Sequence, residues 1–393
     1  MKNFIVDLIY YFNPSIREKN KREGGKRMQK KIMEYIQDCN INFLIGSGAS
    51  RPFLGTLGSI ERLLTELDEK NDIEDNKKEL LKYFIYNKYF NIAMKGNIDL
   101  LSYSDSSTEN EDLKATFENY NKFLTTLNQV ILMRGSAILN KQINLFTTNI
   151  DIFLEYSLEF SGIEFNDGFY GRIKPKFNLN TYKNLRFKTS YFHDNIAETS
   201  VFNLFKLHGS LNWKKEGENI YYDTGLSLVK NLIIDSIEID ISDDDTIDSL
   251  LPKIEDKTLS GKEKKFLKEY DQLSIINPTK QKFKDTVLNI IYYDMLRIYA
   301  NELEKENTVL FVIGFSFADE HIRSVTVRAL NTNPTLTLIV FAYSKEAKEQ
   351  IENELNKSTP INQNIIFISP NNDEEKYDIR TITEKYFNGG KNE

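Results

Sequence analysis

The sequence predicts an α/β fold, a doubly wound Rossmann-like parallel sheet with helical insertions. Short runs rich in Ile, Val, Leu and Phe are typical of strands that are covered on both faces. Helical stretches, such as residues 286–306, 318–329 and 345–355, separate the later runs. Strands that alternate with helices indicate βαβ units, which build parallel sheets. The strand candidates are residues 41–45, 144–147, 201–206, 273–276, 309–313, 335–341 and 365–368.

Composition narrows the class of protein. The chain has 393 residues, of which 40% are hydrophobic and 28% charged, and these near-average values exclude wholesale disorder. The net charge of −7 argues against a general nucleic-acid coat. A single cysteine, Cys39, excludes disulfide frameworks, four-cysteine zinc modules and paired redox cysteines. It also fits a reducing compartment.

Residues 1–40 are predicted to form a helical oligomerisation or linker segment. Residues 4–12 have apolar side chains at helical spacing, which suits packing either on the same domain or on another copy. This stretch contains Asp7, has no A-x-A cleavage site and is too short to span a membrane. A basic run follows at residues 17–31; such runs are usually solvated linkers, and nucleic-acid binding is the alternative. We therefore expect a cytoplasmic protein without a membrane segment.

Residues 41–393 are predicted to form one domain with three interruptions. Residues 59–140 are largely helical and are expected to form a cap or helical insert. Residues 172–200 and 229–270 are expected to be surface insertions. The last of these contains a run of acidic residues, which indicates either a solvated, mobile loop or a partner-binding surface. The acidic residues are Asp235, Glu238, Asp240, Asp243, Asp244, Asp245 and Asp248.

The first predicted strand leads directly into Gly46-Ser47-Gly48-Ala49-Ser50. Two glycines let the backbone approach a ligand closely, and the N–H groups at the start of a following helix suit a pyrophosphate. Tight turns also need glycine for structural reasons alone. A Walker loop would need Gly-Lys-Ser/Thr, and a dehydrogenase fingerprint would need a third glycine where Arg51 stands. The loop therefore disfavours both of these functions.

Polar residues follow three other predicted strands, at residues 147–151, 207–213 and 314–319. Open α/β sheets bind ligands at their carboxyl edge, so these residues are expected to converge with the glycine loop. Each has a structural alternative, because Asn149 and Ser316 could cap helices and His208 could be a structural hydrogen-bonding residue. The four strand-end motifs in this order are more specific than any one of them.

This combination resembles the sirtuin-like family of NAD-dependent enzymes. The similar pieces are Gly46-Ser47-Gly48-Ala49-Ser50, Thr148-Asn149-Ile150-Asp151, Lys206-Leu207-His208-Gly209-Ser210 and Gly314-Phe315-Ser316-Phe317. Sirtuin deacylases usually continue the glycine loop with a Gly-Ile-Pro-Asp-Phe-Arg-like run and hold a structural zinc with four cysteines. This chain instead has Arg51-Pro52-Phe53 and one cysteine. It looks like the bacterial defence branch, which hydrolyses NAD to nicotinamide and ADP-ribose.

The resemblance implies NAD as substrate, no metal, and a role for each motif residue. Asn149 would orient the ribose and water, Asp151 would recognise the carboxamide, and His208 would act as general base. The bond would break through a transition state with oxocarbenium character. The residues expected to bind NAD are Gly46, Ser47, Gly48, Ala49 and Ser50 around the pyrophosphate, Gly314 and Ser316 on the adenosine side, and Thr148.

The resemblance also implies partners. Stand-alone relatives of this kind are found with a HerA-type hexameric ATPase, in a ring-shaped assembly of antiphage defence. We therefore expect a homo-oligomer bound to such an ATPase, with nucleic acid reached only through the partner. The alternatives are an NAD-dependent protein deacylase or ADP-ribosyltransferase, and a non-catalytic scaffold that senses NAD or ADP-ribose. The presence of both Asn149 and His208 disfavours the scaffold.

Overall fold

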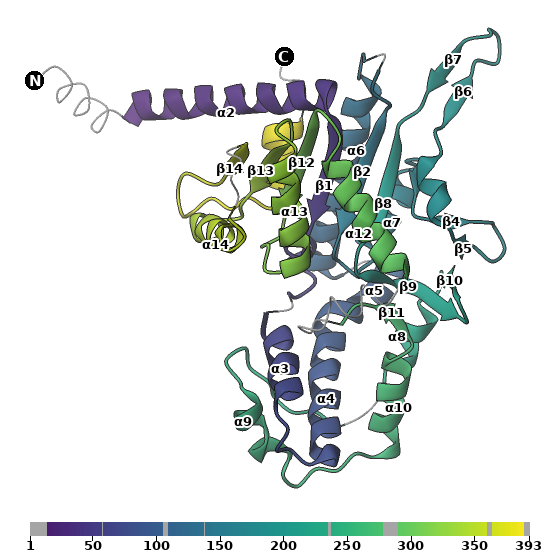
Figure 1. Cartoon of the computed structure of the whole chain (residues 1–393), viewed down its shortest axis with the longest axis vertical. Helices are drawn as coiled ribbons and strands as arrows, with labels where there is room; N and C mark the ends of the chain where they lie inside the picture. The colour runs from purple at the N-terminus through teal and green to yellow at the C-terminus, as the bar shows by residue number, and fades with distance from the viewer. Residues whose placement is uncertain are drawn as a thin grey trace, which may run out of the picture.

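The computed structural model describes residues 14–388 except 57, 105–108, 137, 235–236, 278–289 and 360–363. The apolar stretch at residues 4–12 and the start of the stretch at 286–306 lie outside the described residues. The described chain has a seven-stranded sheet in which all neighbouring strands are parallel, so the predicted fold class is confirmed (Figure 1). Its strands, in spatial order, are β14 (Ile365–Ile368), β13 (Thr337–Phe341), β12 (Thr308–Ile313), β1 (Asn40–Ile45), β2 (Gln142–Thr147), β8 (Val201–Lys206) and β3 (Phe165–Asn166).

Helices cover both faces of this sheet. On one face, Leu44 of β1 belongs to the same buried apolar cluster as Met295 and Tyr299. Helices α12 (Ile290–Leu303), α13 (Glu320–Thr332) and α14 (Lys345–Asn356) contribute to that cluster. On the other face, Phe43 packs edge-on against Phe123, with ring centroids 5.4 Å apart. Helices α2 (Pro14–Asp38) and α6 (Glu111–Leu132) cover this second face. Alternate residues of β1 therefore enter two different cores, which explains its continuous apolar sequence.

Four asparagines form a ladder across neighbouring strands. Asn166, Asn203, Asn144 and Asn42 occupy matching positions in β3, β8, β2 and β1. The Nδ2 group of each donates to the Oδ1 atom of the next, over 3.0, 2.9 and 2.9 Å respectively. Parallel strands in register place identical side chains side by side, so these amides largely satisfy one another, although Asn42 Nδ2 at the end of the row has no hydrogen-bond partner among the described residues.

One strand candidate lies in a different sheet. The run at residues 273–276 forms β11 (Leu273–Ile275), which pairs antiparallel with β9 (Gly209–Glu216). These strands belong to a second sheet of five strands, which also contains β10 (Asn219–Tyr222), β5 (Lys176–Phe177) and β4 (Phe169–Tyr170). The expectation that residues 273–276 join the parallel series was wrong, because an apolar run does not reveal which sheet it enters.

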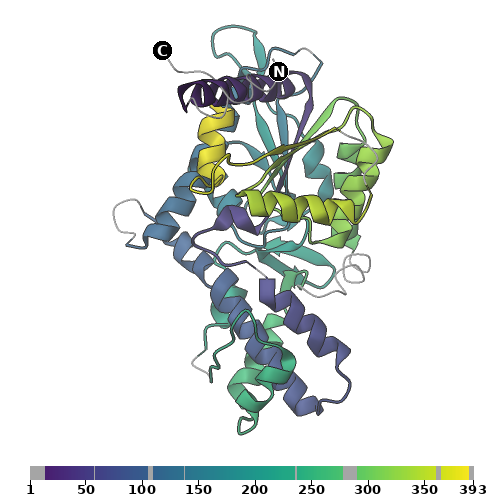
Figure 2. The same cartoon turned by 90° about the vertical axis from the view of Figure 1, so that its left-hand side faces the viewer.

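A helical lobe lies below the carboxyl edge of the main sheet (Figures 1 and 2). It combines α3 (Gly58–Glu69) and α4 (Asp75–Tyr89) with α8 (Ser227–Asn231), α9 (Ile247–Leu250) and α10 (Gly261–Tyr270). The acidic segment is packed into this lobe. Asp243 Oδ1 accepts a hydrogen bond from Ser59 Oγ at 2.8 Å, and Arg62 Nη2 donates to the Asp245 carbonyl at 2.8 Å. The described part of this segment is therefore anchored to the lobe, while the side chains of Asp243 and Asp248 remain 88% and 72% exposed.

The basic run at residues 17–31 forms part of helix α2. The run lies within one continuous helix, although it contains two adjacent glycines. Ile32 and Ile36, near the end of the helix, are buried against the core. None of the described helices is long and apolar enough to cross a membrane.

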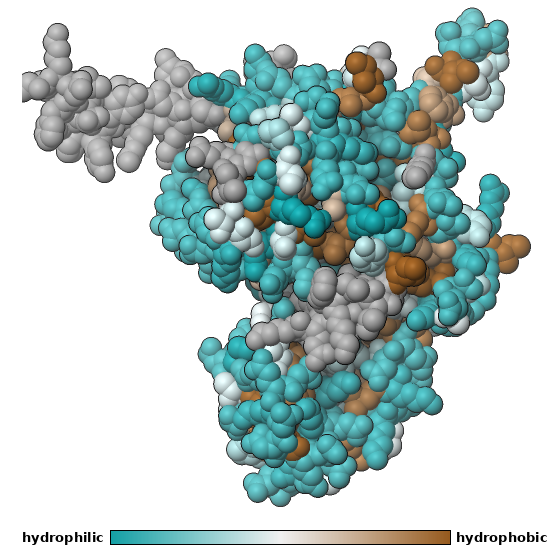
Figure 3. Space-filling model, in the orientation of Figure 1, coloured by the Kyte–Doolittle hydropathy of each residue, from teal (hydrophilic) through white to brown (hydrophobic). Residues whose placement is uncertain are grey.

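A two-stranded hairpin projects from the body as a separate sheet, made of β6 (Phe187–Thr189) and β7 (Ile196–Glu198) (Figure 1). It carries four exposed apolar side chains, and Figure 3 shows hydrophobic residues gathered along it. These are Phe187, Tyr191, Phe192 and Ile196.

Candidate functional site

The four strand-end motifs meet at one edge of the sheet. They follow β12, β1, β2 and β8, which are consecutive neighbours, so their loops emerge side by side. Together they line a cavity of about 540 Å³, a size typical of small-molecule sites. Of the predicted site residues, those in its wall are Ser47, Gly48, Ser50, Thr148, Asn149, Asp151, His208, Gly314 and Ser316, and Asp319 also lines it. Gly46 and Ala49 are not among the lining residues.

The glycine loop packs tightly against the loop after β12. The Gly48 N–H donates to the Gly314 carbonyl at 3.0 Å, and the Ala49 N–H donates to the Gly46 carbonyl at 3.0 Å. A Cβ atom on Gly46 would lie 2.5 Å from the Gly314 carbonyl oxygen, and one on Gly314 would lie 2.4 Å from the Ala49 nitrogen. The glycines thus have a structural role, because no side chain fits between the two loops.

The helix expected directly after this loop is not there. The loop closes as a single 3₁₀ turn at Ser47–Ser50, and the next helix, α3, begins only at Gly58. Because three of the loop's N–H groups, those of Gly46, Gly48 and Ala49, already donate within the protein, the sequence-based picture of a helix N-terminus facing a pyrophosphate needs correction.

Asn149 is buried and one of its polar atoms lacks a partner. Its Nδ2 group donates to the Gly46 carbonyl at 3.1 Å and to Ser50 Oγ at 3.3 Å. Its Oδ1 atom has no hydrogen-bond partner among the described residues, although the side chain is only 6% exposed. A buried acceptor of this kind is costly unless a ligand or water satisfies it. Asn149 does not cap the next helix, α7 (Phe153–Phe160), whose N-cap is Ile152.

Asp151 is held by the protein on both carboxylate oxygens. Oδ2 accepts from Ser50 Oγ at 2.7 Å, and Oδ1 accepts from the Phe153 N–H at 3.2 Å. The Tyr120 hydroxyl lies 2.9 Å from Ser50 Oγ. Burial, and then the negative charge of Asp151, raise the pKa of Tyr120 well above its ordinary value, so this hydroxyl stays protonated. Ser50 therefore connects Asn149, Asp151 and Tyr120.

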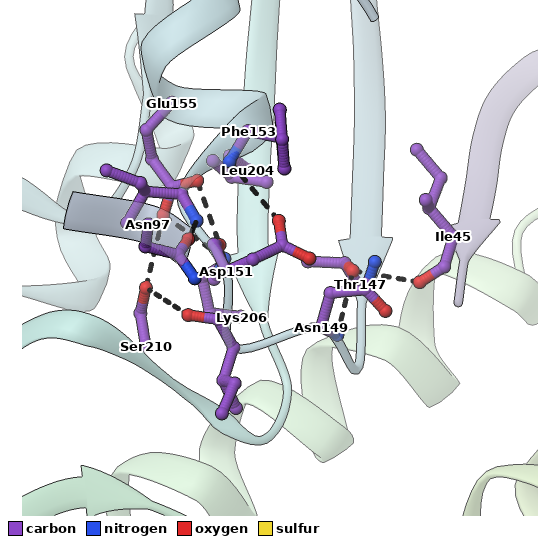
Figure 4. A network of polar contacts seen from close by, with 12 residues as sticks. Ile45, Asn97, Thr147, Asn149, Asp151, Phe153, Glu155, Leu204, Lys206 and Ser210 are labelled. Carbon is purple, nitrogen blue, oxygen red and sulfur yellow. Dashed lines mark hydrogen bonds and ion pairs between the residues drawn. The ribbon is translucent and has the colours of Figure 1, made fainter. Parts of the chain in front are cut away.

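A buried ion pair, drawn in Figure 4, lies next to the loop that carries Asn149 and Asp151. Lys206 Nζ lies 3.2 Å from Glu155 Oε1, and these side chains are only 2% and 4% exposed. Lys206 also donates to the Asp151 carbonyl, and Ser210 Oγ donates to the Ile150 carbonyl at 3.3 Å. Asn97 Oδ1 accepts from the Ile152 N–H at 2.9 Å. The backbone that carries Asn149 and Asp151 is thus fixed from several directions.

His208 faces a carboxylate that the sequence had not singled out. Its Nε2 atom lies 3.2 Å from Asp319 Oδ2, and the two side chains are 14% and 7% exposed. Asp319 is also the N-cap of α13, where its Oδ1 atom accepts from the His321 N–H at 3.0 Å. Asp319 lies within the predicted motif at residues 314–319. Aspartate is a common N-cap residue, so its presence at the start of a helix does not by itself indicate a functional role.

Residues 143–361 match the family model of the SIR2-like domain, which covers more than half of the chain. The chain belongs to the SIR2-like family. The matched range contains Asn149, Asp151, His208 and Asp319, while the glycine loop precedes it. Comparison with curated proteins gives no match. Family membership supports an NAD-related activity for this site, because SIR2-like domains act on NAD as substrate.

The helical lobe completes the SIR2-like site on the side away from the sheet. The cavity is lined on this side by Thr56 in the segment before α3, Glu61 in the first turn of α3 and Tyr89 at the end of α4. Burial, and then the charge of Asp151, raise the pKa of Tyr89 above its ordinary value. None of the three carried a sequence signal, because Glu61 and Tyr89 look like ordinary helix residues and Thr56 like an ordinary loop residue. No group of three His, Cys, Asp or Glu side chains suited to a metal ion occurs in the described part of the chain.

Proposed function

We propose that this protein is an NAD glycohydrolase, which cleaves the nicotinamide–ribose bond to release nicotinamide and ADP-ribose. The observation that carries this proposal is that His208, Asn149 and Asp151 line one cavity of a SIR2-like domain. A base, an amide acceptor and a carboxylate are the groups that the resemblance to the family implies for this cleavage. The same groups would not be needed together for binding alone.

Each side chain has a task that fits its contacts. The Asn149 Oδ1 atom, which has no partner in the described part of the chain, would accept a hydrogen bond from a ribose hydroxyl or from the attacking water. A carboxylate offers about four lone pairs, so Asp151 could accept from the nicotinamide carboxamide in addition to its two protein donors. His208 would remove a proton from the ribose hydroxyl or the water. The nicotinamide leaves as a neutral group, so no strong acid is required.

The rest of NAD would lie along the loops after β1 and β12. Glycines 46 and 48 allow these loops to approach closely, with Gly314 and Ser316 on the adenosine side. Because the Gly48 and Ala49 N–H groups are already engaged, we expect hydroxyls in the cavity wall to contact the phosphates and riboses. Ser47, Thr148 and Ser316 are placed for this role.

We further propose that NAD depletion by this protein serves antiphage defence in the cytoplasm, in a homo-oligomer bound to a HerA-type ATPase. This part rests on the resemblance of the motifs to the defence branch of the family. The projecting β6–β7 hairpin supports it, because exposed apolar side chains that gather at one place are typical of protein interfaces. Replacing Tyr191 and Phe192 by Ser should weaken the assembly in size-exclusion chromatography, and an unchanged profile would argue against this contact.

The test is incubation of the purified chain with NAD, alone and together with the ATPase, followed by chromatography of the products. We expect equal amounts of nicotinamide and ADP-ribose. Consumption of NAD only when an acylated lysine peptide is present would indicate a deacylase instead. Binding of NAD without release of nicotinamide under either condition would indicate a sensing scaffold and would overturn the hydrolase.

A further inference from the structure

We propose that Asp319 is a positioning residue for His208, and that Arg323 fixes the turn which presents Asp319. The effect on turnover rests on the proposed function above. The arrangement itself concerns the imidazole alone and can be tested without NAD.

The contact selects one form of the imidazole ring. Nε2 of His208 is the atom 3.2 Å from Asp319 Oδ2, a contact at ion-pair distance whose geometry falls short of a hydrogen bond in this structure. A carboxylate accepts a hydrogen bond but does not donate one, so when the ring turns to complete this bond the proton of the neutral ring lies on Nε2, and Nδ1 keeps the lone pair. Nδ1 is thus the nitrogen that would accept a proton from substrate or water. The carboxylate would also stabilise the imidazolium that forms, as an orienting acid does for a histidine base.

The two oxygens of Asp319 have separate tasks. Oδ1 accepts from the N–H groups of His321 and Ile322, at 3.0 and 3.2 Å, and thereby caps α13. Oδ2 is the atom directed at His208. An N-cap needs only one side-chain oxygen, so a serine would serve the helix equally well. The second oxygen is what distinguishes aspartate at this position.

The turn before Asp319 is strained and is held in place by one arginine. Phe317 has a φ of +60°, which is unfavourable for a residue with a side chain, and it is fully buried. Arg323 Nη1 donates to the Phe317 carbonyl at 2.7 Å and to the Ala318 carbonyl at 3.3 Å. The same atom lies 3.1 Å from Glu354 Oε2 on α14. Arg323 is 7% exposed and does not line the cavity, so it would act on the site only through this turn.

The decisive variant is Asp319→Ser, which keeps a capping oxygen for α13 and removes the partner of His208. Nitrogen-15 spectra of the labelled histidines should show His208 as a single Nε2–H tautomer in the native chain and as a mixture in the variant. His193, in the hairpin loop, serves as the internal reference. An unchanged His208 spectrum in the variant would overturn the proposal.

Turnover supplies a second readout. We expect Asp319→Ser to lower kcat roughly 10- to 100-fold, part of what a well-placed base contributes. A fall in rate with an unchanged tautomer would assign Asp319 a merely structural role. If the native chain does not hydrolyse NAD, the proposed function fails, while the spectra still decide whether the pair exists.

Arg323→Gln tests the supporting turn, with Arg328→Gln as its matched control on the exposed face of α13. We expect Arg323→Gln to mix the His208 tautomers and to lower kcat by a smaller factor than Asp319→Ser, whereas Arg328→Gln should change neither. Equal behaviour of the two arginine variants would remove Arg323 from the proposal.

Discussion

The asparagine ladder and the single asparagine of the site, Asn149, differ in what their side chains contact. In the asparagine ladder, Asn203 both donates to a neighbouring asparagine and accepts from another. At the carboxyl edge, Asn149 donates twice to the protein but its Oδ1 atom has no described partner, and the residue lines a cavity. Burial alone therefore does not distinguish a structural amide from a binding one. The distinguishing feature is an unsatisfied polar atom next to a space that a ligand can enter.

Alanine substitutions in the ladder and at Asn149 should give the largest difference, because one should affect stability and the other turnover. Asn149→Ala should lower NAD turnover roughly 100-fold or more, as expected when an oriented polar contact to the transition state is removed. Asn203→Ala should instead lower the free energy of unfolding by about 2–4 kcal/mol, because it leaves a buried donor and a buried acceptor without this partner. Turnover per folded molecule should stay normal in Asn203→Ala. The same loss of turnover in both variants would remove the distinction.

The buried ion pair between Lys206 and Glu155 has a structural role, as the asparagine ladder does. Lys206→Met should destabilise the fold by about 3–5 kcal/mol, because it leaves the buried Glu155 carboxylate without its cation. The double variant Lys206→Met, Glu155→Leu should recover a large part of this loss in denaturant unfolding. If the double variant is no more stable than the single one, the cost does not come from the unpaired charge.

Two glycines with similar backbone angles test the close approach of the loops. Gly314 and Gly217 have φ values of +65° and +61°, so alanine is strained at both positions. A Cβ on Gly314 would meet backbone atoms, whereas a Cβ on Gly217 would have no described atom within 4 Å. We expect Gly217→Ala to cost about 1 kcal/mol and Gly314→Ala about 2–4 kcal/mol in thermal unfolding. Equal costs would show that the angle, and not the loop contact, requires glycine.

Asp167 should make a smaller contribution, which is a dependence of the folding stability on pH. Burial raises its pKa to about 6 from an ordinary 3.8. The folded state therefore holds the proton more tightly than the unfolded chain, and stability falls as the pH rises from about 4 to about 6. Asp167→Asn keeps an acceptor for the Phe169 N–H. It should be more stable than the native chain by about 1–3 kcal/mol at pH 7 and equal to it below pH 4. A constant difference across this range would contradict the shift.

The sequence predicts those parts of the fold and site that follow from apolar runs and chain order. Six strand candidates join the parallel sheet, and the polar residues after β1, β2, β8 and β12 line one cavity, because parallel neighbours end at the same edge. The short strand β3 and the place of β11 depend on long-range pairing that no local pattern encodes. The same is true of the contributions of Tyr120 and Asp319. Each looks like an ordinary core or capping residue until the chain folds.

The most direct test of the site is His208→Ala, with NAD binding and nicotinamide release measured on the same preparation. His193→Ala is the matched control, because His193 is exposed and does not line the cavity. We predict that His208→Ala still binds NAD but releases no nicotinamide above background, while His193→Ala behaves like the native chain. Undiminished release from His208→Ala would contradict the assignment of this cavity as a hydrolytic site with His208 as its base.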